Sequence, residues 1–258
     1  MTVILVLVAV YFALVGGMAG LMWTFARIPF PPSATMLSAD ESNFAEDMRR
    51  DFREVREELA HLGFEAADAL RLDYGTLSTA FAVGFKGDGT TFAVYNFDTQ
   101  GGNYVEFRTR STKYGDMISV ARWPTPLEAA RPPAGLLLMV PPMSVSDLLA
   151  FHRAASAAIV GEDMLAVPTE LGAHLLAFHD ARFERAFREK VMVLRAGKTR
   201  FSWPHLLRCA VMTLPPLRFI ASARNRSMAR RIYSEVPRGH LGAIRVPMSR
   251  AALINASR

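Results

Sequence analysis

His152 is the residue whose type and position best suit acid–base chemistry in this sequence. It falls in the helical stripe Leu148, His152, Ala155 and Ile159, so we expect its imidazole on the buried side of a helix. A buried histidine is either hydrogen-bonded within the core or acts as a general base or ligand. We interpret His152 as a core histidine and keep the role of general base or ligand as the alternative.

A second set of chemical groups lies along the predicted strands. Alternation places the small residues Ala80, Ala82 and Gly84 on one sheet face, beside aromatic and charged side chains. Such a small-residue floor could accept a ligand or a partner peptide. The alternative is that the third predicted helix covers this face. The residues of the candidate binding face are Tyr95, Phe97, Tyr104, Glu106 and Arg108.

The motifs that would identify an enzyme are incomplete. His174 and His179 are five residues apart, about 140° around a helix, so they do not share a face as metal ligands would. The segment 197–199 resembles the end of a phosphate loop, but Met192 stands where its first glycine is required. The single cysteine, Cys209, has no evident activating partner. We expect no catalytic residue, metal or cofactor.

A long apolar stretch precedes these candidates. Residues 2–26 are 25 positions without a charged side chain, and Arg27 and a proline-rich segment follow. At about 1.5 Å per residue, a helix of this length exceeds the roughly 30 Å hydrocarbon core of a bilayer. A cleaved signal peptide would carry a basic residue before a shorter apolar core, and Met1-Thr2 supplies none. We therefore expect a single-pass transmembrane anchor at 1–27.

Topology and assembly can also be predicted from this stretch. Arg27 lies on its C-terminal side, which favours an outside N-terminus and a cytoplasmic C-terminal domain. Gly16 and Gly20 form a GxxxG pair, which lets two helix backbones approach closely and predicts a homodimer through the helix. The alternative is that small residues are simply common in spanning helices.

The rest of the chain divides into three regions. A proline-rich linker is expected at 28–37, a folded domain at 38–194, and a basic, partly apolar region at 195–258. With 51% hydrophobic residues, the chain has enough apolar side chains for a proper core, which excludes a disordered tail. One cysteine excludes an internal disulfide framework.

Periodicity predicts the elements of the folded domain. Phe44, Met48, Phe52, Val55 and Leu59 step by four and three, which predicts an amphipathic helix that Ser38 caps and Gly63 ends. Alternating or apolar runs predict strands, and further helical stripes follow. We therefore predict an α+β fold, with an antiparallel sheet of about four to five strands and about three helices over one sheet face. The predicted strands are 76–86, 90–97, 103–110, 117–122 and 136–140, and the later helices are 144–160 and 168–194.

The C-terminal region is strongly basic. Residues 195–258 hold twelve arginines and one lysine against Glu235 alone, a net charge of +12, whereas the chain as a whole carries +6. Such a region suits an anionic lipid surface, with nucleic acid as the weaker candidate because no binding motif accompanies the charge. Residues 201–223 are apolar enough to lie on the membrane surface, and the alternative is that they pack on the folded domain with their arginines in solvent. The expected surface-contact residues are Trp203, Arg208, Arg218, Arg224, Arg226, Arg230 and Arg231.

Together these patterns predict a membrane-anchored binding or scaffold protein, whose α+β domain is held on anionic headgroups by the basic region. Its protein partner is not identified by the sequence. The alternative is a membrane-tethered enzyme that uses the polar sheet face or His152, although no nucleophile with a base and an orienting group is apparent.

Overall fold

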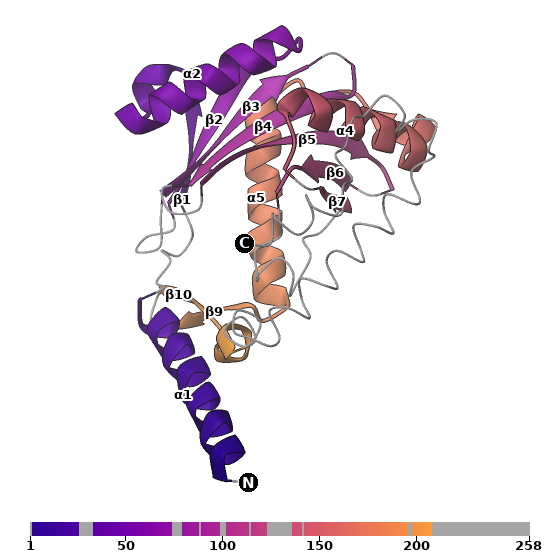
Figure 1. Cartoon of the computed structure of the whole chain (residues 1–258). Coiled ribbons are helices and arrows are strands. Elements are labelled where there is room, and N and C mark those ends of the chain that lie inside the picture. The colour runs from indigo at the N-terminus through magenta and orange to yellow at the C-terminus, as the bar shows by residue number, and fades with distance from the viewer. Residues whose placement is uncertain are drawn as a thin grey trace.

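The computed structural model places most of the first 207 residues in a mixed α+β fold (Figure 1). Most strands form one large sheet, and helices cover both of its faces. Two further strands form a separate hairpin beside the first helix. The predicted α+β class is confirmed. The structure describes residues 2–25, 33–73, 79–87, 89–98, 102–113, 115–122, 136–140, 142–195 and 198–207.

The sheet is larger than predicted, and it is mixed. Its strand order is β1-β2-β3-β4-β5-β6-β7, and β8 pairs with the end of β5. All described pairs are antiparallel except β6 and β7, which are parallel. The prediction of four to five antiparallel strands was therefore wrong. The strands are β1 Ser33–Ser38, β2 Glu65–Asp73, β3 Thr79–Lys86, β4 Thr91–Asp98, β5 Gly102–Ser111, β6 Gly115–Val120, β7 Leu136–Met139 and β8 Met164–Leu165.

β1 and β2 were not predicted as strands, because the local sequence of neither segment favours a strand. β1 comes from the proline-rich stretch, which carries no alternating apolar run. β2 has the sequence EAADALRLD, whose alanine, leucine, glutamate and arginine favour helix over strand. β2 is extended because it pairs along its length with β1 on one side and β3 on the other. Tertiary pairing therefore overrides the local preference.

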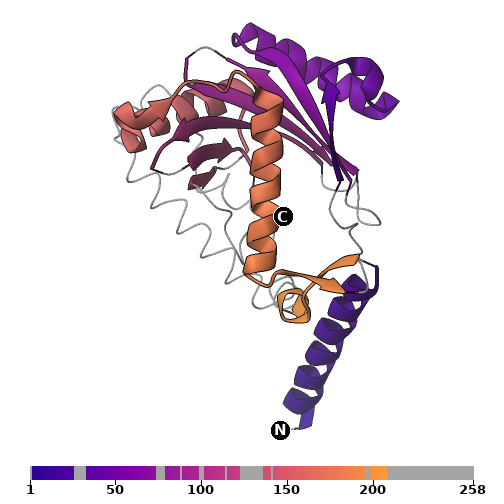
Figure 2. The same cartoon turned by 180° about the vertical axis from the view of Figure 1, so that it is seen from behind.

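Helices cover both faces of the sheet, not one face as predicted. α2 and α4 bury Met48, Phe52 and Phe151 against one face, and α5 buries Leu171 and Leu175 against the other. The opposed views in Figures 1 and 2 show the sheet between these helices. The described helices are α1 Thr2–Phe25, α2 Glu46–His61, α4 Val145–Ile159 and α5 Leu171–Arg188, with short 3-10 turns at Glu41–Asn43 and Gly161–Asp163.

The predicted helix ends are partly correct. Ser144 caps α4, because its hydroxyl accepts a hydrogen bond from the Asp147 backbone N–H at 3.1 Å. Gly63 has a φ of +85° directly after α2, as a helix stop requires. Ser38, however, ends β1, and Asp40 caps a 3-10 turn ahead of α2. The helix predicted at 168–194 ends at Arg188 and is followed by a strand.

The predicted membrane span is corrected by the structure. Among the described residues, no helix is both long enough and apolar enough to cross a membrane. Part of α1 faces protein: Val15 and Ala19 are buried in a small cluster with Leu206, at the other end of the described chain. Figures 1 and 2 show α1 pointing away from the large sheet, next to the hairpin of β9, Met192–Arg195, and β10, Lys198–Phe201.

A tight contact sets the position of α5 on the sheet. The Gly172 backbone N–H donates to Asp68 Oδ2 on β2 at 2.8 Å, near the first turn of the helix. A Cβ at Gly172 would lie 2.8 Å from Met36 Cε and 2.9 Å from Asp68 Cβ. Glycine at this position therefore allows the helix to approach β2 closely.

Replacing Gly172 with alanine should lower the free energy of unfolding by about 1–3 kcal/mol, because the methyl group overlaps Asp68. This sign opposes the intrinsic preference of helices for alanine, which is worth about 1 kcal/mol. Gly17→Ala in α1 is the matched control, since its Cβ would meet no atom within 4 Å. Denaturant unfolding of both variants measures the effect. A Gly172→Ala variant as stable as the native chain would show that α5 is not seated by this contact.

Candidate functional site

The structure divides the candidate binding face between the two sides of the sheet. Tyr95 and Phe97 lie on the side of α2, where Tyr95 stacks on Phe52 with ring centroids 6.4 Å apart. The register pairs Val94 with Glu106, so Glu106 lies on the opposite side, under α5. The five residues predicted as one face therefore do not form one. Tyr104 and Arg108 share the side of Glu106.

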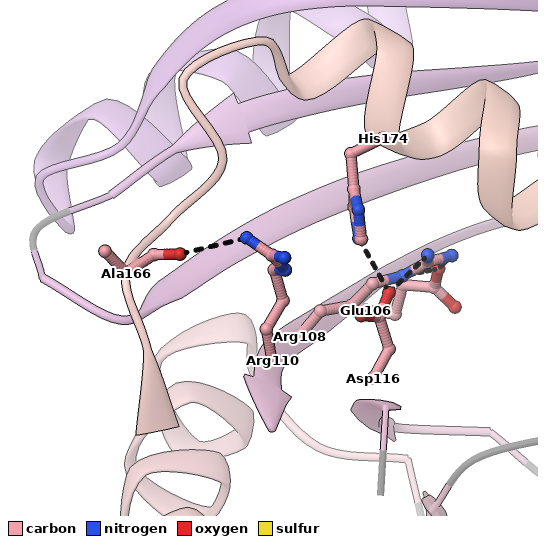
Figure 3. A network of polar contacts seen from close by, with 6 residues as sticks. All are labelled: Glu106, Arg108, Arg110, Asp116, Ala166 and His174. Atoms are coloured by element: carbon pink, nitrogen blue, oxygen red, sulfur yellow. Dashed lines mark hydrogen bonds and ion pairs between the residues drawn. The ribbon is translucent and has the colours of Figure 1, made fainter. Parts of the chain in front are cut away.

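A network of charged side chains lies on the sheet face under α5 (Figure 3). Arg108 Nε donates to Glu106 Oε1 at 2.8 Å, and Arg108 Nη2 contacts the same oxygen. Arg108 Nη1 lies 3.5 Å from Asp116 Oδ2. His174, projecting from α5, places Nε2 3.0 Å from that same Asp116 oxygen. We name Glu106, Arg108, Asp116 and His174 the sheet-face network.

The sheet-face network is buried and covered by aromatic rings. Glu106, Arg108 and Asp116 are each at most 8% exposed. The Arg108 guanidinium carbon lies 4.2 Å from the centroid of the Phe178 ring on α5, and His174 meets Phe92 edge-on at 5.6 Å. These contacts connect β5, β6 and α5. Because the charges are desolvated, removing one partner leaves another charge buried without compensation.

The chemistry open to this network is limited by its own contacts. An aspartate that orients a histidine is one part of a general-base arrangement. Asp116, however, shares one oxygen between His174 and Arg108. In the part of the chain that the structure describes, no group of three or more metal-ligating side chains is present. The geometry matches an ion-pair cluster that holds α5 against the sheet.

His152 occupies the other side of the sheet and is fully buried. Its Nδ1 lies 2.8 Å from Ser119 Oγ and its Nε2 lies 2.9 Å from Thr109 Oγ1. Burial, with a smaller contribution from the Arg153 charge, lowers the pKa of His152 to about 3. The ring is therefore neutral, and both its nitrogens have hydroxyl partners. This is the geometry of a core histidine that joins α4 to β5 and β6.

The α1 junction, which we define as α1, β9, β10 and residues 202–207, holds the remaining described candidates. Trp203 is 43% exposed there. Among the described residues, Cβ atoms built on Gly16 and Gly20 would meet no atom of another element within 4 Å. The six other predicted surface-contact residues lie outside the described residues: Arg208, Arg218, Arg224, Arg226, Arg230 and Arg231.

Exposed apolar side chains gather at the α1 junction. Of the nine large hydrophobic side chains that are exposed among the described residues, all but Met36 belong to it. Large apolar side chains exposed in this number normally indicate an interaction site. The eight are Val6, Val10, Phe12, Leu14, Leu21, Val193, Leu194 and Trp203.

Sequence reasoning missed several residues of these sites. Asp116 follows a turn glycine and gave no signal in the sequence. His174 and Phe178 are four residues apart in a predicted helix, so their shared face was available from spacing alone. Trp23 is separated from Arg195 and Arg200 by most of the chain, and only the tertiary structure brings it beside them.

The fold and the two sites define an α+β protein with a two-sided mixed sheet and an apolar, arginine-containing junction at α1. No protein-family model matches the chain. No curated protein and no solved structure matches it either.

Proposed function

We propose that this chain is a binding protein that attaches to an anionic lipid surface through the α1 junction. The supporting observation is that eight of the nine exposed large apolar side chains of the described residues belong to this junction, which also holds Arg195 and Arg200. The α+β domain then serves as the binding scaffold that is held at the surface. A lipid surface is the occupant that offers apolar contact and negative charge together.

Apolar contact should contribute more to the free energy of this attachment than arginine charge does. Full burial of one large apolar side chain is worth about 1.5–3 kcal/mol. Each arginine near an anionic leaflet adds about 1 kcal/mol. Burial of only two of the eight exposed apolar side chains therefore outweighs two arginines. The chain should bind neutral vesicles, and anionic vesicles more tightly.

Replacing Val10 and Leu14 together with aspartate should weaken vesicle binding by at least about tenfold on both kinds of vesicle, because two exposed apolar contacts on one face of α1 are lost. Cosedimentation of the full chain with phosphatidylcholine vesicles, with and without phosphatidylglycerol, measures this. Ala173→Asp with Ala177→Asp on the exposed side of α5 is the matched control, which adds the same charge elsewhere. Failure of the native chain to bind either kind of vesicle would contradict the proposal.

Two earlier hypotheses stay open beside this proposal. A homodimer through the Gly16 and Gly20 side of α1 remains a prediction, and analytical ultracentrifugation of the same samples tests it. An enzyme remains the alternative function, and His174 suits acid–base chemistry better than His152, because its side chain is 21% exposed whereas His152 is fully buried.

A further inference from the structure

Trp23 holds two arginines at the α1 junction. The Arg195 and Arg200 guanidinium carbons lie 5.4 Å and 4.8 Å from the centroid of its ring. In the β9–β10 register, Arg200 is opposite Val193, which is two residues from Arg195, so both arginines are on one face of the hairpin. Two like charges are thus brought to a single aromatic ring, and cation–π attraction stabilises each of them there.

Within the part of the chain that the structure describes, these two guanidiniums have no anionic partner. Neither forms an ion pair with any carboxylate of the described segments. Arg200 Nε is buried and has no hydrogen-bond partner among the described residues. A buried guanidinium N–H without an acceptor is costly, and two neighbouring guanidiniums repel each other. An anion held by both guanidiniums would balance their like charges.

We propose that Trp23, Arg195 and Arg200 form a binding site for the phosphate of an anionic phospholipid headgroup, an inference that rests on the proposed function. Guanidinium forks match phosphate oxygens and can bind them in pairs. Tryptophan is the side chain that favours the boundary between headgroups and acyl chains. Large apolar side chains are also exposed on two of the elements that carry this site, at Leu21 on α1 and Leu194 on β9.

Replacing Arg195 and Arg200 together with glutamine tests the site in the full chain. Binding to phosphatidylcholine vesicles containing phosphatidylglycerol should weaken about thirtyfold, and binding to pure phosphatidylcholine should change much less. Arg182→Gln with Arg188→Gln is the matched control, because both side chains are exposed on α5 and the charge change is the same. Circular dichroism and thermal unfolding verify that each variant is folded.

Arg195→Lys with Arg200→Lys separates the phosphate fork from simple charge. We expect this variant to bind the anionic vesicles more weakly than the native chain, because lysine keeps the charge but not the paired donors. Native-like binding by the lysine variant would overturn the assignment of a guanidinium site. Binding by the glutamine variant equal to that of its control would also overturn it, and would leave the proposed function standing.

Competition experiments identify the source of the phosphate. Inorganic phosphate and glycerol 3-phosphate should fail to displace the native chain from anionic vesicles. Displacement by either compound at low concentration would assign the site to a free phosphate ligand and overturn the lipid inference. Tighter binding to an RNA oligonucleotide than to vesicles, lost in the glutamine variant, would overturn it in favour of nucleic acid. A native chain that binds neither kind of vesicle would overturn the proposed function together with this inference.

Discussion

Replacing Arg108 with methionine should lower the free energy of unfolding by about 3–5 kcal/mol, because Glu106 and Asp116 would remain buried without their cation. Methionine keeps most of the side-chain length and can still pack on Phe178, so the loss measures the charge more than the volume. Urea unfolding, followed by circular dichroism at neutral pH, gives the difference in free energy.

Arg110→Met is the matched control for this substitution. Arg110 is two residues away on the same strand, and its described side-chain contact is with the Ala166 carbonyl at 3.5 Å (Figure 3). Its replacement should cost about 0.5 kcal/mol or less. Adding Glu106→Gln to Arg108→Met should restore part of the stability, since one uncompensated charge is removed. Equal losses for the Arg108 and Arg110 variants would refute the role of the sheet-face network.

The stability of the folded chain should fall steeply in mild acid because of His152. Its pKa is about 3 in the folded state, below the ordinary value of 6.5. Between these values the unfolded chain binds a proton that the folded chain does not, so stability rises with pH. The contribution is complete above about pH 6.5 and is lost by about 1.4 kcal/mol for each pH unit as the pH falls toward 3.

Denaturant unfolding at several pH values, for the native chain and for His152→Gln, measures this contribution. We expect the glutamine variant to be less stable at neutral pH, because it disturbs the hydrogen bonds to Thr109 and Ser119. The informative quantity is the slope of the free energy of unfolding against pH. In the variant this slope should be smaller by the contribution of about one bound proton. His61→Gln, at an exposed histidine of α2, is the control substitution. A native slope in the His152 variant would contradict the assignment.

Much of the local structure was predictable because it depends on spacing along the chain. Met48, Phe52 and Leu59 recur at helical intervals, and in the structure all three are buried on α2. Alternation likewise predicted β3 and β4 to within a few residues. The capping serine of α4 and the glycine stop after α2 followed from local hydrogen bonding and from the φ values open to glycine.

The location of the candidate sites was not predictable in this way. Alternation separates the two faces of one strand, but only the register shows that Glu106 opposes Val94 and not Tyr95. The sequence also could not indicate that α5 covers Arg108 with Phe178. Likewise, the apolar N-terminal stretch predicted a helix, but its contact with Leu206 depends on residues nearly two hundred positions later.

Sequence alone therefore determined the α+β class, most of the helices and strands, and the imbalance of charge toward residues 195–258. These properties follow from local periodicity, turn residues and composition. The tertiary structure decided the strand order, the parallel pairing of β6 and β7, and the helices on both faces. It also decided that His152 and Arg108 lie on opposite faces of the sheet, and that Trp23 lies beside two distant arginines. Long-range pairing and coverage set these contacts, and no short window of sequence contains both partners.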